Sequence, residues 1–194
     1  MAMTSLQLRA LLAEKFPGLK TRLNEPESAS PNLWPLDWAG GDTAWPNSLA
    51  RGALTEVVAG SNSGSARLLH ALLQWAAGEN QIVALIDGGD CLEVTALDEK
   101  VLSRLLWVRC RSTAEAVKAV DLVLRDANFS LVLLDLKLNQ AAQLRKIPAT
   151  VWHRLQRLIE KTATVCVIFT PHALVSAPRQ RLVLPAKDGA FPRL

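Results

Sequence analysis

From residue 53 to residue 185 the chain alternates between short apolar runs and longer stretches whose apolar residues recur every three or four positions. The short runs predict β-strands at 53–58, 82–87, 105–110, 130–135, 164–169 and 181–185. The first five runs are almost continuously hydrophobic, which is typical of parallel strands buried on both faces. The stretches between them predict helices at 66–77, about 95–103, 113–127 and 148–161. This alternation predicts an α/β fold with a mostly parallel central sheet flanked by helices.

The N-terminal part of the chain has a different pattern. Its first segment predicts an amphipathic helix, with Leu8, Leu11, Leu12 and Phe16 on one face. A stretch rich in proline and polar residues follows. We therefore expect an N-terminal helix within 1–18, a linker and lead-in loop at 19–52, an α/β core at 53–186 and a C-terminal tail at 187–194. The apolar face of the helix is a docking face, either for the core of its own chain or for a neighbouring chain.

The lead-in loop carries three tryptophans, Trp34, Trp38 and Trp45, in a chain that contains no tyrosine. Aromatic side chains in loops usually fix the loop to the core, and a minority form contact points for partners. We expect two of the three to fix the loop to the core.

Composition excludes several classes of protein. Nearly half of the 194 residues (49%) are hydrophobic, which suffices for the core of one domain. The longest apolar runs have the length of strands, so no membrane span is predicted, and no signal peptide is recognisable. Cys91, Cys110 and Cys166 are isolated, as expected for buried thiols of a cytoplasmic protein. The three histidines show no ligand spacing, so no metal site is predicted.

Positive charge is concentrated in the last third of the chain. Residues 1–127 carry 12 basic and 15 acidic side chains, whereas residues 128–194 carry 10 basic and 3 acidic ones. A polyanion or an acidic partner is therefore expected to bind there. The candidate surface for DNA or a protein partner consists of Lys137, Arg145, Lys146, Arg154, Arg157 and Lys161.

The predicted helix at 148–161 carries part of this candidate surface. Its buried stripe is expected to contain Val151, Leu155, Leu158 and Ile159. Arg154, Arg157 and Lys161 fall on another face because they are spaced i, i+3 and i+7. Only Trp152 and His153 are available as platforms for stacking bases, and Trp152 is alternatively a core residue. A solvated helix face without a partner is as compatible with the pattern as DNA contact.

The first core strand leads into Ala59-Gly60-Ser61-Asn62-Ser63-Gly64-Ser65-Ala66, which has the layout of a phosphate-binding loop at the start of a helix. In a working loop the last glycine is followed by a lysine, which neutralises phosphate, and by a hydroxyl residue, which holds Mg²⁺. Here Ser65 and Ala66 occupy those positions, and Ala59 replaces the first glycine. The loop residues Gly60, Ser63, Gly64, Ser65 and Ala66 are therefore interpreted as vestigial, and no cofactor is expected.

The order of motifs along the chain resembles the core of RecA-type recombinases. The matching motifs are Gly52-Ala53-Leu54-Thr55-Glu56, the Ala59–Ala66 loop, Val83-Ala84-Leu85-Ile86-Asp87, Leu106-Trp107-Val108-Arg109 and Val132-Leu133-Leu134-Asp135. The fuller resemblance is to the reduced ImuA-like proteins, which are related to the cell-division inhibitor SulA, and it covers about residues 33–185. It implies a RecA-like phosphate-loop fold.

The same resemblance bears on catalysis. In the RecA pattern the second strand ends with Asp, any residue, and the Glu that activates water; here these positions are Asp87, Gly88 and Gly89. Asp135 matches the Asp that coordinates Mg²⁺, but its usual hydroxyl partner is absent at Ala66. Asp87 and Asp135 are therefore interpreted as vestigial acidic positions, and the chain is expected not to be an enzyme.

ImuA-like proteins are accessory factors of translesion DNA synthesis in the SOS response. The resemblance implies docking to an ImuB-like protein, an error-prone C-family DNA polymerase or RecA, with single-stranded DNA and self-association as further candidates. It implies a cytoplasmic protein, in places associated with the nucleoid. Two alternatives remain: a SulA-like inhibitor that binds a tubulin-like GTPase, and a regulator that binds nucleotide without hydrolysing it.

Overall fold

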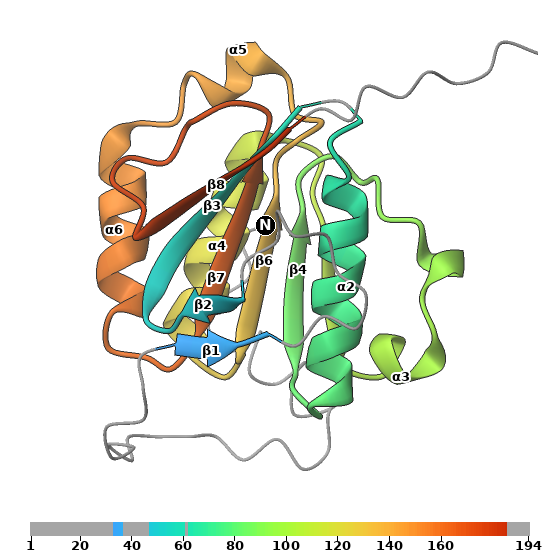
Figure 1. Cartoon of the computed structure of the whole chain (residues 1–194). Coiled ribbons are helices and arrows are strands. Elements are labelled where there is room, and N and C mark those ends of the chain that lie inside the picture. Colours follow the sequence, from blue (N-terminus) through green and yellow to red (C-terminus); the bar gives the residue numbers. More distant parts are fainter. Residues whose placement is uncertain (1–32, 37–46, 61, 186–194) are drawn as a thin grey trace, which may run out of the picture.

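The central feature of the computed structural model is a six-stranded sheet with the order β5-β4-β6-β7-β3-β8, in which every neighbouring pair is parallel (Figure 1). The structure describes residues 33–36, 47–60 and 62–185. The strands are β3 (Ala53–Ala59), β4 (Val83–Asp87), β5 (Leu105–Arg109), β6 (Leu131–Asp135), β7 (Val165–Thr170) and β8 (Gln180–Leu184). The predicted α/β class is confirmed, and the architecture is consistent with a RecA-like α/β fold.

Helices connect the strands. They are α2 (Ser65–Gly78), α3 (Glu99–Leu102), α4 (Thr113–Asp126), α5 (Ala141–Leu144) and α6 (Ala149–Ile159), with a 3₁₀ turn η1 (Val94–Ala96) before α3. The single helix expected at about 95–103 is wrong, because Asp98 adopts an extended conformation and caps a new helix by accepting a hydrogen bond from the Val101 N–H. The sequence pattern does not predict the short α5. None of the described helices is both long and apolar enough to cross a bilayer.

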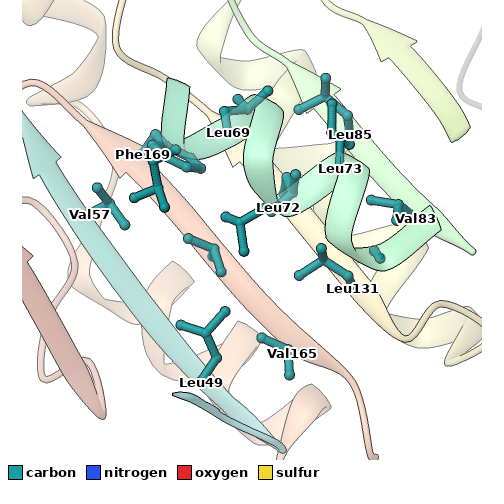
Figure 2. Close-up of a cluster of buried hydrophobic side chains, with 14 of the residues drawn as sticks. Leu49, Val57, Leu69, Leu72, Leu73, Val83, Leu85, Leu131, Val165 and Phe169 are labelled. Atoms are coloured by element: carbon teal, nitrogen blue, oxygen red, sulfur yellow. The ribbon is translucent and has the colours of Figure 1, made fainter. Parts of the chain in front are cut away.

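Successive residues of each strand feed two separate cores. Leu54 and Ile168 pack with α4 and α6 on one face of the sheet, where Trp152 is 1% exposed. Val57 and Phe169 pack against α2 on the other face (Figure 2). This alternation explains why the strands read as continuous hydrophobic runs. The stripe predicted for α6 is partly wrong: Leu155 and Ile159 are buried, but Trp152 joins them, and Val151 and Leu158 are only half-buried.

An antiparallel pair of short strands, β1 (Leu33–Pro35) and β2 (Ser48–Ala50), lies in the stretch that is predicted to be linker and lead-in loop. That prediction is wrong for these residues because both strands supply core side chains. Trp34 is 5% exposed and meets Trp75 of α2 edge to face, with 4.6 Å between ring centroids. Trp34 thus fixes the lead-in segment to the core, which is the role expected for two of the three tryptophans.

Several predictions fall outside the described residues. These are the N-terminal helix with Leu8, Leu11, Leu12 and Phe16, the tryptophans Trp38 and Trp45, and the C-terminal tail. Of the cysteines, Cys110 and Cys166 are buried as predicted. Cys91 is exposed, contrary to prediction, because it lies in the turn after β4 rather than in a strand.

A buried carboxylate holds the connection between β7 and β8. This connection, residues 171–179, contains no helix and passes between two strands that lie on opposite sides of β3. Glu56 of β3 is fully buried, and its Oε1 accepts hydrogen bonds from the Leu174 N–H at 2.6 Å and the Val175 N–H at 3.0 Å. Its Oε2 forms an ion pair with Arg181 of β8. The connection therefore takes its shape from one side chain.

We predict that Glu56→Ala lowers the free energy of unfolding by roughly 3–5 kcal/mol, because it leaves buried donors and the Arg181 guanidinium without their acceptor. Urea unfolding followed by tryptophan fluorescence measures this loss. Glu79→Ala, at an exposed helix end, is the control and should change the stability by no more than about 0.5 kcal/mol. Equal losses in the two variants would show that Glu56 does not organise the connection.

Candidate functional site

The carboxyl ends of β3, β4 and β6 meet at one edge of the sheet and border a cavity of about 1210 Å³. The phosphate loop contributes Gly60, Ser65 and Ala66 to its lining, and the other two strand ends contribute Asp87 and Asp135. The structure thus brings together the vestigial positions identified in the sequence, which is expected where parallel strands end side by side.

A glycine in a left-handed conformation leads the chain into α2. Gly64 precedes α2 with φ of 76° and ψ of 10°, a left-handed conformation that glycine adopts without strain. Its carbonyl accepts the first helical hydrogen bond, from the Leu68 N–H at 3.1 Å. Ser63 is buried, and its hydroxyl has no hydrogen-bond partner among the described residues. The turn into α2 is therefore retained although the chemical groups of the motif are not.

Lys137 reaches this loop from the end of β6. Its Nζ lies 3.2 Å from the Ser65 hydroxyl, 3.4 Å from Asp135 Oδ2 and 5.3 Å from the centroid of the Phe169 ring. The side chain is only 14% exposed. The sequence predicts Lys137 as part of the basic surface, but its side chain lies beside Ser65. Ser65 is at the position where a working phosphate loop has its lysine. The one signal in the sequence is its position two residues after Asp135.

Asp135 is the counter-charge of this lysine. Its Oδ1 also accepts a hydrogen bond from the backbone N–H of Lys137 at 3.0 Å. Burial raises the pKa of the Asp135 carboxyl above its usual value, and the nearby Lys137 ammonium opposes that rise. Both oxygens are thus engaged by Lys137, and Ala66 supplies no hydroxyl to help hold a metal ion. The residues present do not fit a bound nucleotide with Mg²⁺.

Asp87, the second acidic position, fastens the turn that follows β4. Its Oδ2 accepts hydrogen bonds from the N–H groups of Cys91 and Leu92, each at 2.9 Å, and from the Trp107 indole of β5 at 3.3 Å. Its Oδ1 accepts one from the Gly89 N–H at 3.3 Å. A carboxylate with this many donors is a structural anchor and is poorly placed to activate water.

The turn itself leaves little room for an acidic catalyst. A Cβ atom at Gly88 would lie 2.8 Å from the Asp135 carbonyl oxygen, so this position requires glycine. A Cβ atom at Gly89, where the RecA pattern has its Glu, would lie 3.1 Å from the Cβ of Leu138. Asp90, one residue further, is exposed and forms an ion pair with Arg109. No carboxylate in this turn takes the place of the missing Glu.

The thiol of Cys91 adds no reactive group to the cavity. Partial burial is the main cause that raises its pKa to about 12, and the nearby Asp135 and Asp87 carboxylates add to the rise. It is therefore a protonated thiol at neutral pH and a weak nucleophile.

The remaining residues of the predicted basic surface lie elsewhere. Arg154 and Arg157 are on α6, and Lys161 follows it, all three exposed as predicted. Arg145 and Lys146 are exposed between α5 and α6. Trp152 is a core residue and cannot stack on a base. The structure thus separates Lys137 from the other five cations.

Within 33–36, 47–60 and 62–185, no cluster of three or more His, Cys, Asp or Glu side chains is arranged to hold a metal ion. Comparison with protein-family models and with curated protein sequences gives no match to this chain. The geometry of the cavity and of the basic surface therefore decides which functions the chain can support.

We predict that Lys137→Met lowers the free energy of unfolding at neutral pH by on the order of 3 kcal/mol, because it leaves the Asp135 carboxylate buried without a counter-charge. The double variant Lys137→Met with Asp135→Asn should recover part of this loss, since it removes both charges. Urea unfolding provides the measurement, and Lys146→Met, at an exposed position, is the control.

The loss in Lys137→Met should shrink as the pH falls from about 8 to about 5, because the pKa of Asp135, already raised, rises further without the ammonium. The native variant then binds a proton that the unfolded chain does not, so lower pH favours the native state. A loss that is independent of pH, or one as small as that of Lys146→Met, would contradict the ion pair.

Proposed function

We propose that this chain is a non-catalytic, RecA-like accessory protein of the SOS DNA damage response that acts in translesion synthesis by docking to other macromolecules. The observation that carries the proposal is the Lys137 ammonium, which lies between Ser65 and Asp135 at the phosphate loop. Because the Asp135 carboxylate neutralises this ammonium and engages Lys137 with both oxygens, the pair offers neither a free cation to a phosphate nor a free carboxylate to a metal ion.

Three further features argue against hydrolysis. The loop lacks the lysine and the hydroxyl of the working motif, at Ser65 and Ala66. Asp87 is fully used as a hydrogen-bond acceptor. The position of the water-activating Glu is Gly89, where a larger side chain meets Leu138. Each loss alone would lower the rate of phosphoryl transfer, and together they remove both the positioning of the phosphate and the activation of water.

The docking role is supported by what the chain exposes. Lys118, Arg125, Arg154 and Arg157 lie on α4 and α6 and are exposed to solvent. The resemblance to ImuA-like proteins suggests an ImuB-like protein, an error-prone C-family polymerase or RecA as partner, in the cytoplasm. DNA contact through the same residues is the alternative to a protein partner.

Binding and hydrolysis of ATP test the non-catalytic part. With Mg²⁺ present, we expect no saturable binding of a fluorescent ATP analogue below about 1 mM, which corresponds to a binding free energy weaker than about 4 kcal/mol. We also expect no release of phosphate above that of buffer. Turnover by the purified chain would overturn the proposal.

A regulator that binds nucleotide without hydrolysing it is the second candidate, and the Lys137–Ser65 contact is the observation that favours it. If Lys137 serves as a substitute for the missing lysine, ATP should bind with micromolar affinity without Mg²⁺-dependent turnover. Lys137→Ala should then abolish binding, whereas Lys146→Ala should not.

The cellular role is tested with Arg154→Glu combined with Arg157→Glu. We expect this variant to fail to restore damage-induced mutagenesis in a strain that lacks the gene, because charge reversal repels the docking partner. Lys100→Glu combined with Arg104→Glu changes the net charge equally on the α3 side and should restore it. Normal mutagenesis together with altered cell division would favour the SulA-like alternative instead.

A further inference from the structure

The outer sides of α4 and α6 form one cationic face. We define the α4–α6 face by Lys118 and Arg125 of α4, Arg154 and Arg157 of α6, and Lys161 just after α6, all exposed. Lys118 and Arg125 are seven residues apart within α4, and Arg154 and Arg157 are three apart within α6, so each pair lies on one side of its helix. The two α4 residues lie outside the basic third of the sequence, and only the fold brings them to the others.

A carboxylate already lies within this face and links the two helices. Asp121 of α4 has its Oδ2 2.8 Å from the Nε of Arg125 and its Oδ1 2.9 Å from the Nε of Arg154. The Asp121 side chain is 14% exposed, whereas the two arginines are 49% and 50% exposed. Asp121 thus accepts a hydrogen bond from Arg125 and forms an ion pair with Arg154, and both arginine side chains remain about half exposed.

The charge of the face exceeds what Asp121 neutralises. No ion pair joins Lys118, Arg157 or Lys161 to any described residue. A guanidinium group has a planar fork that pairs with a carboxylate through two hydrogen bonds, and a fork that is held in place loses less entropy on binding. The face can therefore bind carboxylates of a partner in the way that it already binds the carboxylate of Asp121.

The surroundings favour separate carboxylates over a nucleic acid strand. Proteins that bind single strands without sequence preference usually stack bases on aromatic side chains. Trp152 of α6 is 1% exposed and faces the core, which leaves the His153 imidazole as the exposed ring of that helix. The cations are also interrupted by Asp121 and by Glu160, which would repel a continuous row of phosphates but fit between spaced acidic groups.

We infer that the α4–α6 face docks an acidic segment of a protein partner, whose carboxylates bind the outer edges of Arg154 and Arg157. This inference rests on the proposed docking function and names the chemistry of the partner. It places the docking surface on the opposite side of the sheet from α2.

The test uses the full chain and two labelled probes of equal net charge, a glutamate-rich peptide and an oligothymidylate. Fluorescence anisotropy at about 0.15 M salt should show saturable binding of the peptide, and the oligothymidylate should bind more weakly. Arg154→Glu combined with Arg157→Glu should weaken peptide binding at least about tenfold, whereas Lys100→Glu combined with Arg104→Glu should change it less than about threefold.

Asp121→Asn gives a test in the opposite direction. Removing the internal carboxylate raises the net positive charge of the face by one, which outweighs the loss of the order that Asp121 gives the arginines, so peptide binding should tighten about threefold. Glu79→Gln, the same change in charge at a distant exposed site, should leave it unchanged. Melting temperatures of all variants establish that they are folded.

Equal losses in the two charge-reversal pairs would overturn the inference, since the peptide would then respond only to net charge. Tighter binding of the oligothymidylate through the same residues would also overturn it and identify nucleic acid as the occupant. None of these measurements involves ATP or cells. If the peptide binds as expected, but Arg154→Glu combined with Arg157→Glu still restores mutagenesis in the strain that lacks the gene, the proposed function is contradicted. This inference then stands.

Discussion

The need to neutralise buried carboxylates at the ends of parallel strands shapes this molecule more than any other constraint. An ionised carboxylate taken out of water is strongly disfavoured unless a cation or several hydrogen-bond donors accompany it. Asp135 is 5% exposed, and the chain meets this requirement with Lys137, its neighbour two residues on. That lysine lies beside Ser65, in the loop before α2. The ion pair that stabilises the end of β6 therefore also lines the cavity next to this loop.

Two further buried carboxylates, on β4 and β3, are satisfied by the same means. Asp87 binds the turn between β4 and the 3₁₀ segment, and Glu56 binds the connection between β7 and β8. Each lies on a different strand, and the oxygens of each accept hydrogen bonds from within the chain. The carboxyl edge of the sheet, where open α/β folds usually bind their ligands, is thus held together by its own acidic residues. The exposed cations of α4 and α6 have no comparable internal role apart from the contact with Asp121.

Much of the fold could be predicted from hydrophobic periodicity. The predicted core strands agree with the observed ones to within about one residue, because buried parallel strands give uninterrupted apolar runs. The β1–β2 pair escapes prediction because three residues such as Leu33–Pro35, with a proline, give no periodic signal. At the site, the positions of the loop, Asp87 and Asp135 follow from motif order. The role of Lys137 does not, because a contact between residues 65 and 137 depends on the side-chain direction at the end of β6.

The loop before α2 carries no cation at Ser65, and the cation beside that residue is Lys137, which follows β6. NMR spectra of the labelled chain, titrated with ATP and Mg²⁺, test this most directly through the backbone amides of residues 60–66. We expect these resonances to stay unchanged up to millimolar ATP, because Lys137 and Asp135 remain paired. Saturable shifts of these amides at micromolar ATP, with a matching shift of the Lys137 ammonium away from Asp135, would contradict the loss of nucleotide binding.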